Sequence, residues 1–216
     1  MLVTAMEPRR KSMVEIYLDG QSAGQVDYET AVRLRVRPGD EMTDDEWTTL
    51  CAESDIARAK SYAFWLLERR SYTSGMLREK MRTAHSPAAI DAAIVRAQEL
   101  GLVDDADYAH RYAAELIRLR HFSTMRIVQE LRHRGIDRDL AQQAAADAAA
   151  EYAPDPAKAI DALLRTKFSG KYGDEKGRRR TVAALQRMGY RWDDIRAALQ
   201  RSETPDWDDE ETKGFD

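Results

Sequence analysis

The spacing of apolar positions changes near residue 54, and this change divides the chain into two kinds of structure. Before that point, apolar and polar residues alternate over 14–18, which predicts a short strand, and the Asp19-Gly20 pair that follows is typical of a hairpin turn. The pattern after the turn is compatible with a return strand or with a short helix that begins at Tyr28. We therefore expect residues 1–54 to form a small N-terminal α+β head with a short β-hairpin and a linker.

From residue 55 onward the apolar residues recur at helical spacing. Ser86-Pro87 and Asp155-Pro156 each combine a helix cap with a proline at the first helical position, and Gly101 marks a helix end. The second part of the chain is therefore predicted to be almost entirely helical. Three aspartates within 104–107 open a further helix, and its apolar stripe contains Tyr108, Tyr112, Ala113, Leu116 and Leu119.

The helices also repeat along the chain. A shift of 50 residues places Leu77 on Ile127, and a shift of 54 places Leu131 on Leu185. Each repeat holds three helices, of which the second is short and rich in arginine. Such a unit buries little apolar surface alone, so neighbouring units must share it. The third helix of each repeat is expected to be capped by Ser86, Asp137 or Asp193.

We therefore predict a mainly α protein, an elongated tandem array of three three-helix repeats that follows the small N-terminal head. The acidic segment at the end of the sequence is predicted to be disordered, because it is short of apolar residues and rich in charge. The expected segments are the head at 1–54, the three repeats at 55–101, 102–152 and 155–201, and the disordered acidic tail at 202–216.

Charge is distributed unevenly along the chain. The net charge of -4 is the sum of three unequal parts. The head has 6 basic and 11 acidic side chains, the body over 55–201 has 27 basic and 20 acidic ones, and the tail has 1 basic and 7 acidic ones. A basic body between two acidic ends indicates nucleic acid or an acidic protein surface as a partner. A solvated helical surface that is rich in arginine explains the same charge, so charge alone leaves both interpretations open.

The sequence contains few residues that are suited to catalysis. The single cysteine, Cys51, excludes a disulfide framework and a cysteine-rich zinc site, and the four histidines lack metal-ligand spacing. A glycine-rich phosphate loop is also missing. We therefore expect no enzyme activity, no cofactor and no metal. The lack of a long uncharged apolar run and of a signal pattern predicts a cytoplasmic protein without a membrane span.

Basic side chains are the candidates for a binding surface, because guanidinium groups along a rigid array match phosphates or carboxylates through paired hydrogen bonds. The three consecutive arginines at 178–180 cannot all face one way on a helix, since neighbouring residues are about 100° apart. The candidate binding residues are Arg82, Arg118, Arg120, Arg126, Arg132, Arg134, Lys167, Lys171, Arg178, Arg179, Arg180 and Arg187.

The order of the helices and several short motifs resemble the RecX family, which are bacterial regulatory proteins of RecA recombinase. The clearest match is Leu-Gly-Leu-Val-Asp-Asp-Ala-Asp-Tyr-Ala at 100–109, followed by Arg-Ile-Val-Gln-Glu-Leu-Arg-His-Arg-Gly-Ile at 126–136. In the third repeat the match continues through Lys167-Phe168, 185–190 and 192–199. The resemblance covers about 55–200, and the order and spacing of these motifs are more specific than any one of them.

The resemblance implies a regulatory protein that binds RecA nucleoprotein filaments on DNA, inhibits ATP hydrolysis and strand exchange, and so modulates recombination and the SOS response. Single- or double-stranded DNA would be bound weakly and without sequence selectivity. No exposed apolar seam indicates a dimer, so a monomer is expected. The residues alone also support an alternative, an autonomous DNA-binding protein built from tandem helix-turn-helix-like units, because short arginine-rich helices suit that role equally well.

Overall fold

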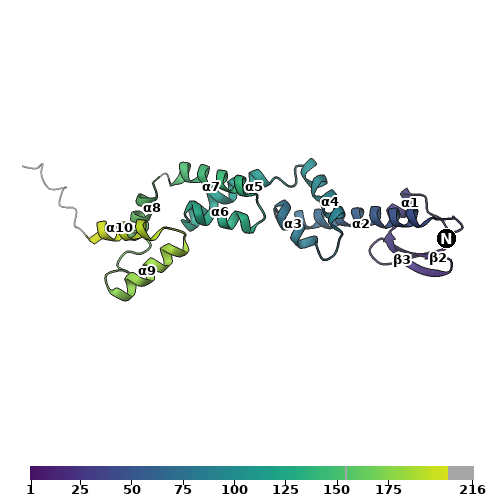
Figure 1. Ribbon diagram of the computed structural model, residues 1–216, viewed down its shortest axis with the longest axis horizontal. Coiled ribbons are helices and arrows are strands. Elements are labelled where there is room, and N and C mark those ends of the chain that lie inside the picture. Colours follow the sequence, from purple (N-terminus) through teal and green to yellow (C-terminus); the bar gives the residue numbers. More distant parts are fainter. Residues whose placement is uncertain (154, 204–216) are drawn as a thin grey trace, which may run out of the picture. The chain divides into compact units, whose positions relative to one another are not determined.

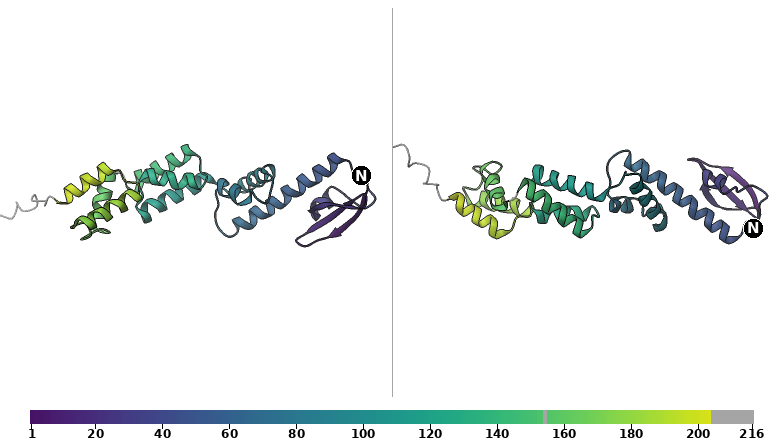
Figure 2. Two further views of the ribbon diagram at one scale, coloured as in Figure 1. Left: turned by 60° about the horizontal axis from the view of Figure 1, so that its bottom comes forward. Right: turned by 90° about the horizontal axis from the view of Figure 1, so that it is seen from above.

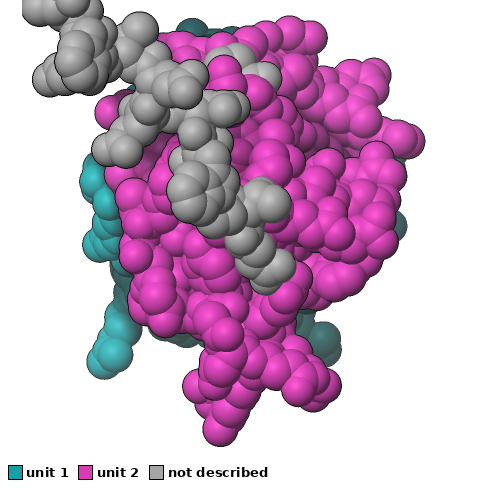
Figure 3. Space-filling view, turned by 90° about the vertical axis from the view of Figure 1, so that its left-hand side faces the viewer, with its two compact units in different colours: residues 1–105 teal, residues 106–216 magenta. Residues whose placement is uncertain are grey.

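The computed structural model describes residues 1–153 and 155–203, and Figure 1 labels most of their helices and strands. The chain separates into two compact units, Met1–Asp105 and Ala106–Asp216, which Figure 3 distinguishes by colour. Within the described ranges, no helix combines the length and the apolar character that crossing a membrane requires.

Unit 1 begins with a three-stranded antiparallel sheet in the order β1-β2-β3. The Asp19-Gly20 turn joins β2 to β3 with φ angles of 49° and 81°, as a tight turn with two left-handed residues requires. This hairpin matches the expectation, but the sheet also contains β1, which the sequence pattern did not indicate. β1 lacks a strong alternating pattern because Val3 is its only fully buried residue. The strands are β1 (Val3–Pro8), β2 (Met13–Leu18) and β3 (Gln21–Asp27).

Two helices complete the head. Helix α1 (Tyr28–Arg33) follows β3 directly, because the Asp27 side chain accepts a hydrogen bond from the Thr30 backbone N–H at 2.8 Å and caps the helix. The chain is therefore helical at Tyr28. Helix α2 (Asp44–Leu67) runs without interruption across residue 54, so the segment expected to be a linker is helical instead. Figure 2 shows the sheet beside the first half of α2.

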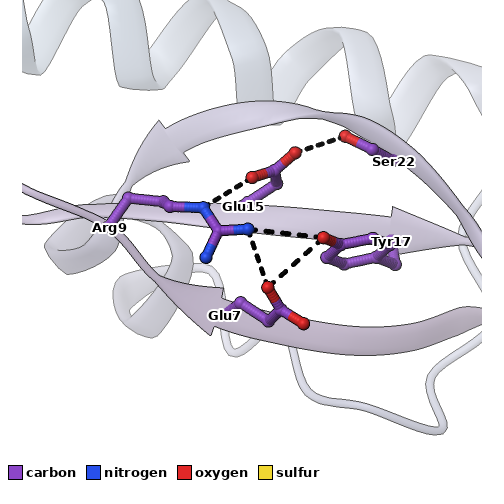
Figure 4. A network of polar contacts seen from close by, with 5 residues as sticks. All are labelled: Glu7, Arg9, Glu15, Tyr17 and Ser22. Carbon is purple, nitrogen blue, oxygen red and sulfur yellow. Dashed lines mark hydrogen bonds and ion pairs between the residues drawn. The ribbon is translucent and has the colours of Figure 1, made fainter.

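The outer face of the sheet carries a network of polar side chains, which Figure 4 shows. The Arg9 guanidinium donates to Glu15 at 2.6 Å and to Glu7 at 2.7 Å, and Ser22 donates to the second oxygen of Glu15 at 2.6 Å. The hydrogen bonds from Ser22 and Arg9 hold the pKa of Glu15 below its ordinary value. These exposed contacts cross all three strands and keep the face polar, while Ile16 and Val14 point into the core beneath it.

The first repeat combines the second half of α2 with α3 (Ser74–Met81) and α4 (Pro87–Glu99). Side chains from all three helices form one buried cluster, which includes Leu66, Leu77 and Ile94. A polar contact fixes the turn between α3 and α4 against α2, because Asp55 accepts hydrogen bonds from the His85 ring at 2.7 Å and from the Ser86 backbone N–H at 2.9 Å. Ser86 caps α4 as the sequence predicts.

The second repeat contains α5 (Asp105–Glu115), a π-helical turn η1 (Leu116–Arg120), α6 (Thr124–His133) and α7 (Arg138–Tyr152). Its buried cluster is built on Ile127, Leu131 and the alanines of α7. The predicted apolar stripe of the first helix fails at its end, because Leu119 is 70% exposed. The wider turn η1 shifts the register of the helix, so Ile117 is buried in place of Leu119.

The third repeat contains α8 (Pro156–Arg165), α9 (Glu175–Arg187) and α10 (Trp192–Glu203) around a cluster that includes Ile160, Leu185 and Ile195. Asp193 lies in the first turn of α10 and so does not cap it, in contrast to the expectation. Ser202 and Glu203 end α10, although the disordered tail was expected to begin at 202. The remainder of that tail, 204–216, lies outside the described residues.

Each repeat thus encloses its own apolar cluster, and the head has a fourth, built on Val3, Ile16 and Leu50. The predicted fold class is confirmed in this respect: the protein is mainly α, with three three-helix repeats and a small α+β head. In the head, β1 adds a third strand to the expected hairpin of β2 and β3.

Candidate functional site

One face of α9 carries three exposed basic residues. Lys176, Arg180 and Arg187 are four and seven residues apart, which places them within about 40° of one another around the helix. All three are exposed, and none has an ion-pair partner within 1–153 and 155–203. We call these three residues the α9 cationic face. Three unpaired positive charges on a rigid helix attract phosphates or carboxylates.

The start of α9 is held by local contacts that bring a basic turn close to it. Asp174 caps the helix by accepting a hydrogen bond from the Gly177 backbone N–H at 2.9 Å. A Cβ atom at position 177 would lie 2.2 Å from the Lys171 carbonyl oxygen, so only glycine permits this close approach of the turn. The turn exposes Lys171, whose ammonium group donates to the Lys167 carbonyl at 2.8 Å. The predicted residues Lys167 and Lys171 therefore lie together at the surface of the third repeat.

The arginine triplet at 178–180 divides among three environments, as the helical geometry requires. Arg178 is half-buried on the side of α9 that turns toward the repeat core. Arg179 is exposed but forms an ion pair with Glu175, one turn earlier, at 2.5 Å. Arg180 lies on the α9 cationic face. Only one member of the triplet is thus both exposed and unpaired within the described part of the chain.

In the second repeat, α6 supplies two of the predicted residues. Arg132 is exposed near the end of the helix, and its guanidinium donates a long hydrogen bond of 3.4 Å to the Ile136 carbonyl. Arg126 is half-buried, lies 5.6 Å from the centre of the Phe122 ring, and pairs with Glu130 at 2.6 Å. Arg126 is consequently less available to a partner than Arg132.

Arg134 has a structural position. Its guanidinium donates to the Tyr108 hydroxyl at 3.0 Å and to the Tyr112 hydroxyl at 2.8 Å, and lies 4.0 Å from the centre of the Tyr112 ring. Partial burial lowers the pKa of Arg134, but the hydrogen bonds to both tyrosines outweigh this effect and raise it. Arg134 therefore stays charged while it joins α6 to α5, and both terminal nitrogens are already occupied.

The other predicted residues are spread over the surface. Arg82 follows α3 in unit 1 and pairs with Glu79 at 2.8 Å, with both side chains well exposed. Arg118 and Arg120 lie on the π-helical turn, and Arg118 is 5.2 Å from the centre of the Tyr152 ring. The structure thus gathers Lys167, Lys171, Arg180 and Arg187 in the third repeat, while Arg82 belongs to the other unit.

The second and third repeats are joined at a tight junction. Ser123, which caps α6, donates from its hydroxyl to the Gly189 carbonyl at 2.8 Å and from its backbone N–H to the Met188 carbonyl at 2.9 Å. The Tyr190 hydroxyl donates to the His121 carbonyl at 3.1 Å. This junction links the start of α6 to the turn that follows α9, so the two arginine-rich helices are coupled through hydrogen bonds.

Lys176 was absent from the set of predicted binding residues, although the sequence contains the signal that finds it. Counting four residues back from Arg180 along the expected helix reaches Lys176, on the same face. The described residues contain no group of three or more histidine, cysteine, aspartate or glutamate side chains that is arranged to hold a metal ion. The chemistry that this surface supports is binding of anionic groups.

Comparison with known proteins identifies the family. Residues 104–144 match the family model described as RecX, second three-helix domain. The chain is 30% identical over 145 residues to the regulatory protein RecX of Caldanaerobacter subterraneus, covering 66% of this chain and 73% of that protein. It is 32% identical over 143 residues to the regulatory protein RecX of Trichlorobacter lovleyi, covering 64% and 92%.

Solved structures show the same fold. The crystal structure of a regulatory protein RecX superposes with a TM-score of 0.60 at 19% identity, over 92% of this chain and 98% of that one. RecX from Lactobacillus salivarius gives a TM-score of 0.52 at 21% identity, over 68% and 96%. Because the sequence relatives are matched over most of their length and the motifs fall within the helical repeats, this chain belongs to the RecX family of regulatory proteins.

Proposed function

We propose that this protein binds RecA nucleoprotein filaments on DNA in the cytoplasm, inhibits their ATP hydrolysis and strand exchange, and thereby modulates recombination and the SOS response. Membership of the RecX family carries the proposal. The α9 cationic face supports it, because exposed and unpaired cations suit both acidic protein surfaces and DNA phosphates.

The proposed contact uses charge more than apolar area. Lys176, Arg180 and Arg187 lie on one helix that is fixed at its start by the Asp174 cap, so the three charges keep their spacing without a partner. The junction at Ser123 and Gly189 keeps α6 in a fixed relation to the turn after α9. A rigid surface of this kind loses little conformational entropy on binding, which favours contact with several subunits of a filament.

The test is the ATPase activity of RecA on single-stranded DNA while this protein is titrated in. We expect inhibition, and inhibition well below one molecule per RecA subunit indicates that one molecule affects several subunits. Strand exchange should fall over the same range of concentrations. Unchanged ATPase and strand exchange at saturating protein would refute the proposal.

A pair of charge-matched variants locates the surface. The triple variant Lys176→Glu/Arg180→Glu/Arg187→Glu should weaken inhibition by about tenfold or more, because three favourable charges become repulsive. The control Arg138→Glu/Lys158→Glu/Arg196→Glu changes the net charge by the same amount at other exposed positions of unit 2. Equal effects of the two variants would show that net charge matters and that the α9 cationic face does not.

A second candidate function is autonomous DNA binding by the helical repeats. The observation that favours it is the unpaired state of the α9 cations within the described residues, since phosphates can neutralise them without any RecA. A gel-shift assay at rising salt, with and without RecA, separates the two. Weak binding that is lost steeply with salt fits both functions, whereas strong sequence-selective binding without RecA favours the second.

We also propose that the protein acts as a monomer without a cofactor and that the limits expected between its three repeats, at about 101 and 152, are the limits of separate folding units. Size-exclusion chromatography with light scattering tests the oligomeric state. Limited proteolysis tests these limits, and cleavage concentrated close to 101 and 152 is the expected result.

A further inference from the structure

A cleft in unit 1 has a composition that differs from the α9 cationic face. The cleft has a volume of about 910 Å³ and lies between the β1–β2 turn on one side and the middle of α2 on the other. Arg10 and Lys11 come from the turn, and Arg58, Tyr62 and Trp65 come from α2. All of these residues belong to the same unit, so the cleft is complete within it.

The α2 wall presents an aromatic surface. Trp65 is 47% exposed, although large aromatic side chains are usually buried. Its ring stacks with that of Tyr62, with ring centres 5.9 Å apart and an interplanar angle of 27°. The exposed Arg69 guanidinium lies over the Trp65 ring at 3.5 Å from its centre. The ring therefore accepts a flat group on its face. The group that lies there is the exposed Arg69 side chain, which also donates to the Trp65 carbonyl at 2.7 Å and which a base would have to displace.

Cations surround this aromatic surface. Arg10, Lys11 and Arg58 are exposed, and none of them has an ion-pair partner within the described part of the chain. Two acidic residues also line the cleft: Asp27, whose carboxylate caps α1, and Glu29, which is exposed in the first turn of α1. The turn holds Lys11 and Ser12 at φ angles of 59° and 57°, a left-handed conformation that costs energy in residues other than glycine.

We propose that this cleft binds single-stranded nucleic acid, with a base stacked on Trp65 and Tyr62 and the adjacent phosphates bound by Arg10, Lys11 and Arg58. Aromatic rings that stack bases, flanked by cations that follow the backbone, are how proteins bind single strands without sequence selectivity. A duplex fits less well, because its bases are already stacked on one another and cannot reach the ring. An acidic peptide would satisfy the cations but leave the flat aromatic surface without a matching group.

The proposal concerns a site separate from the one assigned to filament regulation. The α9 cationic face has no exposed aromatic residue at its centre and binds through charge, whereas the cleft combines charge with stacking. Two separate sites would allow one molecule to hold single-stranded DNA through unit 1 while unit 2 contacts another part of the same complex.

Photo-crosslinking of the full-length protein tests the site directly. The probe is a single-stranded oligothymidylate in which some bases are replaced by 5-iodouracil, which crosslinks to aromatic residues in contact with it. Digestion with trypsin releases residues 61–69 as one peptide, which contains Tyr62 and Trp65. We expect the adduct on this peptide, and a duplex that carries the same label should give at least tenfold less.

Binding of the same oligonucleotide by variants provides the second measurement. Trp65→Ala should weaken binding about tenfold, in the range found for loss of one base–aromatic stack. The matched control is Trp192→Ala, since Trp192 is 50% exposed but lies in unit 2. Arg10→Glu/Lys11→Glu should weaken binding and flatten its salt dependence, whereas Arg35→Glu/Arg37→Glu, with the same charge change on unit 1, should do neither.

Several outcomes would overturn the proposal. Adducts on α9 without adducts on 61–69 would place single-strand binding in unit 2. Equal adducts with single strands and duplex would contradict base stacking. Displacement of the strand from 61–69 by a polyglutamate peptide at lower concentration than by unlabelled oligothymidylate would identify an acidic peptide as the better ligand. None of these results bears on inhibition of RecA, which is measured separately with the α9 variants.

Discussion

The junction between the second and third repeats can be tested by substituting one glycine. Gly189 has a φ angle of 91°, and a Cβ atom placed on it would lie 2.4 Å from the Ser123 hydroxyl oxygen and 2.6 Å from the Arg126 Cβ. Real Cβ atoms do not approach so closely, so Gly189→Ala must move α6 away from the turn after α9. Movement there breaks the hydrogen bonds that Ser123 makes to Met188 and Gly189.

The magnitude follows from two contributions. An alanine at positive φ destabilises the folded state by about 1–2 kcal/mol relative to glycine. Alanine also lowers the conformational entropy of the unfolded chain, which offsets about 0.4–1 kcal/mol of that cost. Forcing an extra methyl group into a packed contact costs about 1–3 kcal/mol more. Gly189→Ala should therefore destabilise unit 2 by about 1–5 kcal/mol in total.

Gly170 provides a control in the same unit. Its φ angle is 68°, but a Cβ atom there meets nothing within 4 Å. Gly170→Ala therefore carries the backbone cost alone, and we expect a loss of about 1 kcal/mol. The difference between the two variants isolates the contact with Ser123 and Arg126.

Hydrogen exchange measured by mass spectrometry at increasing urea is the suitable assay, because it reports each unit separately and does not assume that the whole chain unfolds in one step. Peptides from α6 and α10 should lose protection at lower urea in Gly189→Ala than in Gly170→Ala, while the peptides of the head stay unchanged. Equal destabilisation by the two variants would refute the idea that close packing at Gly189 holds these repeats together.

Three further predictions concern other parts of the molecule. Arg134→Lys should destabilise unit 2 by about 1–2 kcal/mol in urea unfolding, because a lysine cannot hydrogen-bond both tyrosines. Arg132→Lys, at an exposed position nearby, should change the free energy of unfolding by less than about 0.5 kcal/mol, and similar losses in the two variants would contradict the structural role of Arg134. Burial acts to raise the pKa of Asp55, but hydrogen bonds from the Ser86 backbone and His85 outweigh burial and lower that pKa. The Asp55 carboxylate therefore stabilises the folded state at pH values above its ordinary pKa of 3.8, and this stabilisation is lost as the pH falls through the lower pKa of the folded state. The difference in unfolding free energy between wild type and Asp55→Asn should accordingly narrow as the pH falls through that range, and a constant difference would show that the charge contributes nothing. Deletion of 204–216, which removes 6 acidic side chains and 1 basic one, should strengthen DNA binding and steepen its salt dependence in a gel-shift assay, whereas unchanged affinity would show that this segment does not compete with DNA.

Local signals in the sequence determined the helical part of the fold. Helical spacing of apolar residues depends only on residues a few positions apart, and so do helix caps such as Ser86 and Asp155. Both can therefore be predicted without knowledge of any tertiary contact. The spacing of equivalent leucines then predicted three repeats, and each encloses its own apolar cluster in the structure. The Asp19-Gly20 turn was predictable for the same reason, because its conformation is a property of two residues.

The candidate site was only partly predictable. Periodicity places Arg180 and Arg187 on one helix face, and the same periodicity adds Lys176. Periodicity cannot distinguish an arginine that faces solvent from an arginine that is hydrogen-bonded to another helix. Arg134 is of the second kind, because it donates to two tyrosines of α5. Such a difference depends on how two helices pack, which no local pattern records.

Tertiary structure alone decided the remaining features. Strand β1 forms because β2 supplies its hydrogen-bond partners, since its own residues have little strand pattern. The π-helical turn exposes Leu119 and buries Ile117, which the regular helical spacing of the sequence does not predict. The cleft beside Trp65 joins residues more than 50 positions apart, Lys11 and Trp65 among them. Sequence patterns report the preferences of neighbouring residues, whereas these features arise from contacts between segments that only folding brings together.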